Sequence, residues 1–136
     1  MTREQFILRL LEVFKEDADD VYSNGLEKGW LEFEDKLYRD DEITRKNIAR
    51  IIHMYLLKVC GIHDIQDISK AGELRDLYDC RVCANHVAQI YLRGIMGAEE
   101  LSANGGFLWF DLNGEDETEV IEDYLIRAYE ISDRAD

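Results

Sequence analysis

Two pairs of cysteine and histidine residues have the spacing of zinc ligands. Cys60 and His63 are separated by two residues, and Cys80 and Cys83 follow with the same separation. A turn with a two-residue gap can direct both side chains at one tetrahedral ion, and structural zinc sites use such pairs for this reason. The spacing therefore predicts, as one hypothesis, a small cytoplasmic domain stabilised by a structural zinc ion that these four residues hold.

The same cysteines also suit a core without metal. Cys80 and Cys83 share a helical face with Val87 and Ile90, and a reduced cysteine packs as a small apolar residue. No glutamate stands in the His-Glu arrangement of catalytic zinc sites, and the sequence has neither a glycine-rich phosphate loop nor a nucleophile elbow. We therefore expect no enzymatic activity and no cofactor other than the zinc ion of the first hypothesis.

Large aromatic residues form a second group with possible chemistry. If Trp109 and Phe110 lie exposed beside Trp30, their rings present a face to a sugar or to a protein partner. If they are buried, they belong to the core, where large aromatic residues are common. Trp30 is the member of this group that we retain as a candidate ligand-binding residue.

The elements that must position these residues are mainly helices. Apolar residues recur at helical spacing, Thr2 and Gln5 form a capping-box pattern, and Gly29, Gly61 and Gly94 follow helical segments. The run from Phe107 predicts a short extended segment near 107–111. The fold class is thus all-α, a single domain of about five or six helices. The expected helices are 3–15, 17–28, 45–59, 73–92 (one helix or two) and 118–129.

Length and charge exclude several classes of function. The chain has 136 residues, which suits one domain, and its net charge is −14. Residues 97–136 hold twelve acidic and two basic residues, so they carry −10 of this charge. Such a field repels nucleic acid and anionic membranes. No apolar run approaches the roughly 20 residues of a membrane span, and no signal segment is visible, so we expect no membrane insertion and a cytoplasmic location.

A weak internal repeat divides the chain into units of about 1–58 and 59–130. Helices with a threonine-led start begin at Thr2, Thr44 and Thr118. Between them, two helices end in glycine followed by large apolar residues, at Gly29 and at Gly94.

This order resembles the S-layer homology (SLH) module of bacterial cell-wall proteins, in a degenerate and permuted form. The best match runs from Asp76-Leu77-Tyr78-Asp79 through Cys83-Ala84, Val87 and Ile90 to Gly94-Ile95-Met96-Gly97. Tyr38 to Arg45 is similar to the family's approach to its Thr-Arg helix. The third threonine-led helix has Glu119 where the family has arginine.

The resemblance implies a binding module rather than an enzyme. In the family, three modules hold a pyruvylated cell-wall glycan, which would place this chain at the cell wall. The groups that the resemblance implies as ligands are Thr2, Arg3, Thr44 and Arg45, since a helix N-terminus favours an anion and arginine adds a bidentate fork. Trp30 lies near the same groove in this hypothesis. The partner is then a cell-wall glycan or a protein, and a homo-oligomer is compatible with the sequence.

Overall fold

The computed structural model describes residues 1–101 and 107–135, and over these residues the protein is a small, mostly helical domain. This confirms the predicted fold class. The described chain forms six α-helices, two 3₁₀ segments and one two-stranded hairpin. In chain order they are α1 (Arg3–Val13), α2 (Val21–Lys28), α3 (Phe33–Leu37), α4 (Arg45–Lys58), η1 (Ser69–Glu73), η2 (Leu77–Asp79), α5 (Ala84–Leu92), β1 (Glu99–Leu101), β2 (Phe107–Trp109) and α6 (Thr118–Ala135).

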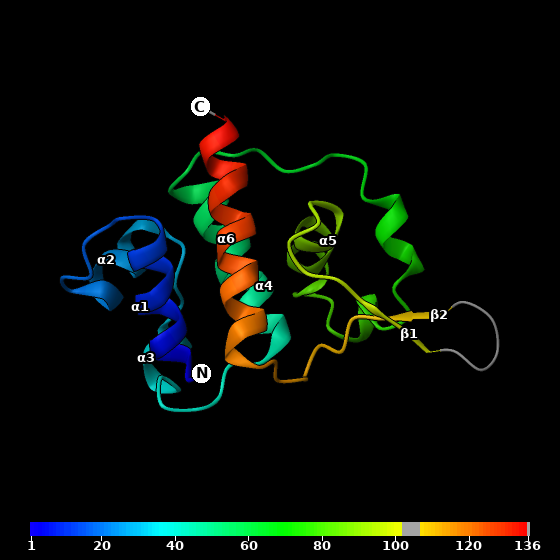
Figure 1. Cartoon of the computed structure of the whole chain (residues 1–136), viewed down its shortest axis with the longest axis horizontal. Helices are drawn as coiled ribbons and strands as arrows, with labels where there is room; N and C mark the ends of the chain where they lie inside the picture. The colour runs from blue at the N-terminus through cyan, green and yellow to red at the C-terminus, as the bar shows by residue number, and fades with distance from the viewer. Residues whose placement is uncertain (102–106, 136) are drawn as a thin grey trace.

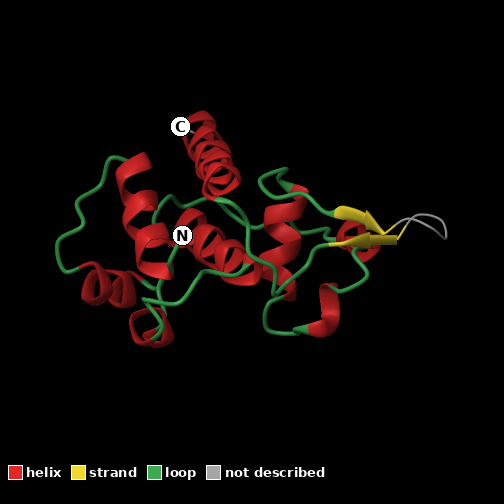
Figure 2. Cartoon of the chain, turned by 60° about the horizontal axis from the view of Figure 1, so that its bottom comes forward, coloured by secondary structure: helices red, strands yellow, loops and turns green. Residues whose placement is uncertain are grey.

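Helix α4 lies at the centre of the fold. It packs against both α5 and α6, while α1 contacts α6 and the short helix α3. Figure 1 shows α1, α2 and α3 gathered at one end of the molecule and the β1–β2 hairpin at the other. The same separation is visible in the turned view of Figure 2. Any site between α3, α4 and α5 therefore joins residues from the two halves of the chain.

The apolar face of α4 forms much of the core. Ile48, Ile51, Ile52, Tyr55 and Leu56 are all buried on this helix. Their spacing of three and four residues produces one continuous stripe, which is why this segment is the clearest helix in the sequence. Other large side chains that are fully buried around this stripe include Phe6, Ile7, Leu10, Ile43, Leu77, Ile90, Ile95 and Phe110.

The N-termini of α1 and α4 are covered in the same way. At the start of α1, the Arg3 backbone amide donates to the Asp41 carbonyl oxygen at 2.9 Å. At the start of α4, the Arg45 backbone amide donates to the Gly114 carbonyl oxygen, also at 2.9 Å, and the Lys46 backbone amide donates to the Leu112 carbonyl oxygen. The first two threonine-led helices are thus each capped by the loop that precedes the next one. These first-turn amides already have backbone partners, so they do not act as open anion sites.

Several predicted boundaries differ from the structure. The expected apolar connector after Trp30 contains helix α3, whose entry is stabilised by the Glu32 amide donating to Asp35 Oδ2 at 2.8 Å. The predicted helix 73–92 is regular only in α5, because the chain before it forms the 3₁₀ segments η1 and η2. The last predicted helix ends at residue 129, whereas α6 continues to Ala135.

The extended segment expected near 107–111 is confirmed as strand β2. It pairs with β1, which lies in the acidic stretch where we expected no strand, in an antiparallel register that sets Glu99 opposite Trp109. Over the described ranges 1–101 and 107–135, no helix is both long and apolar enough to cross a membrane.

Candidate functional site

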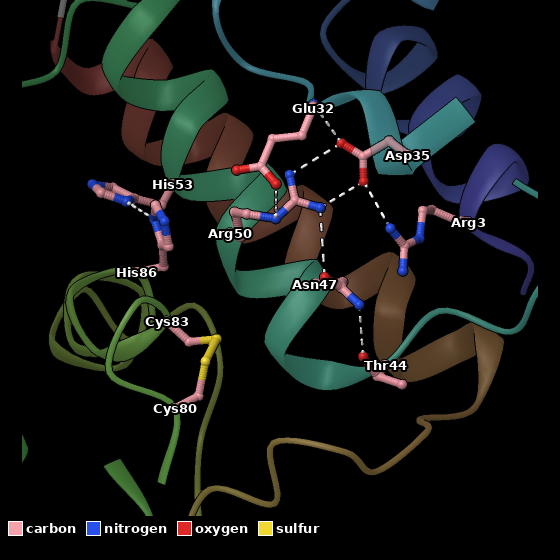
Figure 3. Close-up of polar contacts among 10 residues, drawn as sticks. All are labelled: Arg3, Glu32, Asp35, Thr44, Asn47, Arg50, His53, Cys80, Cys83 and His86. Carbon is pink, nitrogen blue, oxygen red and sulfur yellow. Dashed lines mark hydrogen bonds and ion pairs between the residues drawn. A yellow bond between two sulfur atoms is a disulfide. The ribbon is translucent and has the colours of Figure 1, made fainter. Parts of the chain in front are cut away.

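A polar cleft of about 380 Å³ lies between the α3–α4 region and the turn that leads into α5. We call it the Arg3–Arg50 cleft. It gathers cationic, anionic, aromatic and sulfur-bearing side chains from segments far apart in the sequence, several of which Figure 3 shows. The residues that line it are Arg3, Glu32, Glu34, Tyr38, Lys46, Asn47, Arg50, Cys80, Val82, Cys83 and His86.

A buried ion triad forms the floor of this cleft. Asp35 is 0% exposed, and its carboxylate accepts hydrogen bonds from both terminal nitrogens of the Arg50 guanidinium, at 2.5 and 3.0 Å. Arg3 Nη1 donates to the same carboxylate at 3.0 Å. Two arginines on one carboxylate leave a net positive charge, and the low dielectric of a buried site strengthens each of these hydrogen bonds.

The local sequence explains how the triad is held. Arg3 lies in the first turn of α1, Asp35 lies in α3, and Arg50 lies in α4. The Arg50 side chain also donates to the side-chain oxygen of Asn47, one helical turn earlier. The side-chain nitrogen of Asn47 in turn donates to Thr44 Oγ1 at 3.0 Å. Three helices are therefore tied together by charge-assisted hydrogen bonds, as Figure 3 shows.

Arg3 retains hydrogen-bonding capacity beside this cleft. Its Nη1 contacts Asp35, but its Nε is buried and has no hydrogen-bond partner within the described part of the chain. Its guanidinium carbon lies 5.9 Å from the centre of the Tyr38 ring. A buried donor without a partner is unfavourable, and because this Nε is closed to solvent as well, a molecule in the cleft does not reach it unless the Arg3 side chain moves.

Two carboxylates oppose the cations at the cleft. Glu32 Oε2 lies 3.9 Å from Arg50 Nε, and Glu32 also has a hydrogen bond to Glu34. That hydrogen bond and burial raise the pKa of Glu32, although Arg50 acts in the opposite direction. The cleft thus offers donors and acceptors together rather than a purely cationic surface.

A chain of hydrogen bonds joins the side of the cleft to a second carboxylate. His86 Nδ1 lies 2.7 Å from His53 Nδ1, and His53 Nε2 lies 2.7 Å from Asp64 Oδ1. Burial, with the nearby charges of His53 and Arg50, lowers the pKa of His86 to about 4. When both rings are neutral and Asp64 accepts from His53 Nε2, His86 must donate through Nδ1, and its Nε2 is left as an acceptor.

The environment of Asp64 matches this role. Burial alone would raise the pKa of Asp64, but hydrogen bonds from His53 and Asn85 outweigh it, so the pKa of Asp64 is lowered. The carboxylate is therefore ionised and orients the histidine pair.

The four predicted zinc ligands do not form one cluster. Cys80 and Cys83 are joined by a disulfide bond, and Cys60 takes no part in it. Among residues 1–101 and 107–135, no group of three or more histidine, cysteine or acidic side chains has the arrangement of a metal site. His63 contributes its carbonyl oxygen to Arg93. The zinc hypothesis thus has no assembled site here, and it stays a prediction.

The five predicted ligand-binding residues are distributed over the molecule. Arg3 lines the Arg3–Arg50 cleft, whereas Trp30 and Arg45 line two other cavities of about 330 Å³ each. Thr2 Oγ1 accepts from the Gln5 amide as a helix cap, and Thr44 Oγ1 accepts from Asn47. Of these five residues, only Arg3 lines the cleft. Thr44 is connected to the cleft indirectly, because it accepts a hydrogen bond from the lining residue Asn47.

Trp30 and Arg45 are both integrated into the fold. Trp30 is 3% exposed and packs edge-on against Tyr55. Of the two residues on which the alternatives depended, Phe110 is buried in the core and Trp109 is half-buried. Arg45 donates through Nε to the Phe110 carbonyl oxygen and through Nη1 to Asp116 and Tyr124. The third nitrogen of its guanidinium donates to the Gly97 carbonyl oxygen at 2.7 Å.

Sequence reasoning missed most of the residues that line the cleft. Lys46, Asn47 and Arg50 follow Thr44 and Arg45 at spacings that place them on one face of α4, which is a signal that could have been used. Nothing local indicates that Asp35 joins Arg3 and Arg50, since these partners lie 32 and 15 residues away.

Comparisons with known proteins add no neighbour to this description. The chain matches no family model, no curated protein and no solved structure.

Proposed function

We propose that the protein is a non-enzymatic binding module that holds a saccharide in the Arg3–Arg50 cleft. The observation that carries this proposal is the buried triad, in which Asp35 fixes Arg3 and Arg50, two arginines that line the cleft. Fixed charged donors lose little conformational entropy on binding, so they favour a ligand that supplies several hydrogen-bonding oxygens.

The other groups in the cleft suit a polyhydroxylated ligand. A sugar hydroxyl both donates and accepts, and the cleft supplies donors from Lys46 and Asn47 together with acceptors from Glu32. Tyr38 adds a half-exposed aromatic ring at the same site, against which the apolar face of a sugar ring can pack.

The resemblance to SLH modules supports the same ligand class. It implies a cell-wall glycan as ligand and Arg3 as one of the groups that bind it, and Arg3 is the residue of the implied set that lines the cleft. The net charge of −14 opposes a strongly acidic polymer. A single carboxylate, such as that of a pyruvate ketal on the sugar, can nevertheless pair with the local cations Arg3, Lys46 and Arg50.

Calorimetric titration with soluble cell-wall glycan fragments tests this function. We expect saturable binding to the wild type, and Lys46→Ala should weaken the affinity about tenfold, since a hydrogen bond from a charged group contributes roughly 1.5–3 kcal/mol. Lys58→Ala is the matched control, because it removes the same charge from the other end of α4 at an exposed position outside the cleft. Absence of binding to the wild type, or equal losses in the two variants, would contradict the proposal.

A further inference from the structure

The Cys80–Cys83 disulfide lies at the Arg3–Arg50 cleft, but the proposed binding function assigns no role to its sulfur atoms. Both cysteines are half-buried and line the Arg3–Arg50 cleft. The residues between them are exposed, and Val82 has 85% of its surface accessible although it is apolar. The nearby Tyr78 is 66% exposed. An external molecule can therefore approach the sulfur atoms without unfolding the chain.

This disulfide is poorly placed to act as a structural crosslink. It joins cysteines three positions apart, so it closes a very short loop. In the chain-entropy account, stabilisation by a disulfide grows with the length of the loop it closes, and a loop this short restricts the unfolded chain least. The same turn is already held by the Cys83 amide, which donates to the Cys80 carbonyl oxygen at 3.1 Å.

The two sulfur atoms have different surroundings. Cys83 is the N-cap residue of α5, a helix of nine residues, so its sulfur lies near the positive end of the helix dipole, which favours negative charge, although its side chain makes no hydrogen bond to a first-turn amide. Cys80 follows η2 and has no such helix behind it. The cations of the cleft face the disulfide from α1 and α4 (Arg3, Lys46, Arg50), and the opposing carboxylates are Glu32 and Glu34. His86 lies one helical turn beyond Cys83 and lines the same cleft.

We propose that Cys80 and Cys83 form a thiol–disulfide exchange site, in which Cys80 is attacked by an external thiol and Cys83 is the leaving group. The thiolate of a small thiol or a cysteine-containing peptide attacks Cys80 Sγ, and the bond between the two protein sulfurs breaks. Its electron pair goes to Cys83 Sγ, which leaves as a thiolate and then takes a proton from water. The better-stabilised thiolate leaves faster, which fixes the direction of attack.

A second external thiol completes the exchange. It attacks the external sulfur of the mixed disulfide, so that Cys80 leaves as a thiolate and takes a proton from water. Two external thiols are oxidised to one disulfide, and the protein disulfide is reduced to two thiols. The reverse sequence, with an external disulfide as oxidant, restores the crosslink.

Trapping the intermediate with glutathione tests this site. The oxidised chain carrying Cys60→Ser, which removes the third thiol, is mixed with reduced glutathione at neutral pH and quenched at intervals with an alkylating reagent. Peptide mass spectrometry then locates glutathione and the alkyl group, while near-ultraviolet circular dichroism monitors the fold. We expect glutathione on Cys80, the alkyl group on Cys83 and a native spectrum throughout.

Two results would overturn the proposal. The first is a disulfide that resists glutathione until urea unfolds the chain, which would make it a structural crosslink. The second is glutathione found on Cys83 with the alkyl group on Cys80. The Cys83→Ser variant supplies an independent arm, since glutathione disulfide should leave a lasting mixed disulfide on Cys80 when no neighbouring thiol can displace it. Because no glycan is present in these assays, their outcome is separate from that of the binding proposal.

Discussion

Two arginines at equivalent places in the sequence have different environments. Arg3 and Arg45 each follow a threonine at the start of a helix, and the resemblance to SLH modules implies the same role for both. In the structure, each nitrogen of the Arg45 guanidinium has a hydrogen-bond partner within the protein. The guanidinium carbon of Arg45 also lies 4.6 Å from the centre of the Phe110 ring. Of these two arginines, Arg3 has a buried Nε that finds no partner among residues 1–101 and 107–135. Position after a threonine therefore does not decide which arginine lines the Arg3–Arg50 cleft.

Replacing Arg45 should reduce stability rather than glycan affinity. Arg45→Ala removes hydrogen bonds to two backbone carbonyls and leaves Asp116 without its cation, so we expect a loss of about 3 kcal/mol in the free energy of unfolding. Urea denaturation measures this loss. Arg45→Lys keeps the charge without the fork and should be intermediate. An unchanged unfolding midpoint combined with lost glycan binding would instead support a ligand role for Arg45.

The lowered pKa of His86 predicts a specific pH dependence of stability. Its pKa is about 4 in the folded protein, against 6.5 for an unperturbed histidine. Between these values the unfolded chain binds a proton at this site that the folded chain does not, so acidification from pH 6.5 to 4 favours unfolding. We expect a loss of about 1–2 kcal/mol over this window, after allowance for solvent screening.

Urea denaturation of wild type and His86→Gln at several pH values separates this contribution. The variant should lose the slope between pH 6.5 and 4. It should keep the further loss at lower pH that comes from protonation of Asp64, whose pKa is lowered in the folded state. Equal slopes for the two proteins above pH 4 would show that His86 is not the group responsible.

The helix starts show how similar sequence patterns lead to different local structures. Thr2 and Gln5 form a reciprocal capping box in α1. Thr44 has an extended backbone at the start of α4, but its side chain makes no hydrogen bond to a first-turn amide and accepts from the Asn47 side chain instead. The two threonines are thus equivalent in sequence and different in energetic role.

A matched pair of substitutions tests this difference. Thr2→Ala removes a true cap and should cost about 1 kcal/mol of stability. Thr44→Ala removes only a hydrogen bond to a half-buried side chain, so we expect a cost of less than half that amount. Thermal and urea unfolding of the two variants provide the comparison. A Thr44→Ala cost equal to or greater than that of Thr2→Ala would contradict the assignment of the caps.

The sequence predicted elements where one physical signal dominates. Helices α1 and α4 have long apolar stripes, so their positions were correct to within about two residues. Helix α3 has only five residues, too few for periodicity to appear, and it depends on the contact between Asp35 and the Glu32 amide. The segment before α5 was predicted as helix because leucines recur in it, but it forms two 3₁₀ turns that no periodicity distinguishes.

At the scale of the whole molecule, the candidate site depends on contacts between distant segments. The resemblance to SLH modules implies Arg3 as a ligand group, but its partner Asp35 and the cleft-lining residue Cys83 come from other segments of the chain. The zinc pattern in the sequence depends on spacing alone, and the fold uses two of its cysteines in a disulfide. Spacing identifies residues with chemical potential, while the tertiary contacts decide which of them share a site.

Three of the cavities in the described part of the chain give the central claim a direct test. One is the Arg3–Arg50 cleft, one is lined by Trp30, and one is lined by Arg45, and they share no lining residue. A molecule with a net charge of −14 will attract few anions unless local cations are placed together, and only the first of these cavities combines two arginines with a lysine.

The most direct measurement is a two-dimensional amide NMR titration with soluble cell-wall glycan fragments. We predict that the largest saturable shifts fall on the amides around the Arg3–Arg50 cleft, such as those of Asn47, Val82 and His86. Shifts centred on Trp30 or on Arg45, or none at a saturating glycan concentration, would contradict the assignment of this cleft as the ligand site.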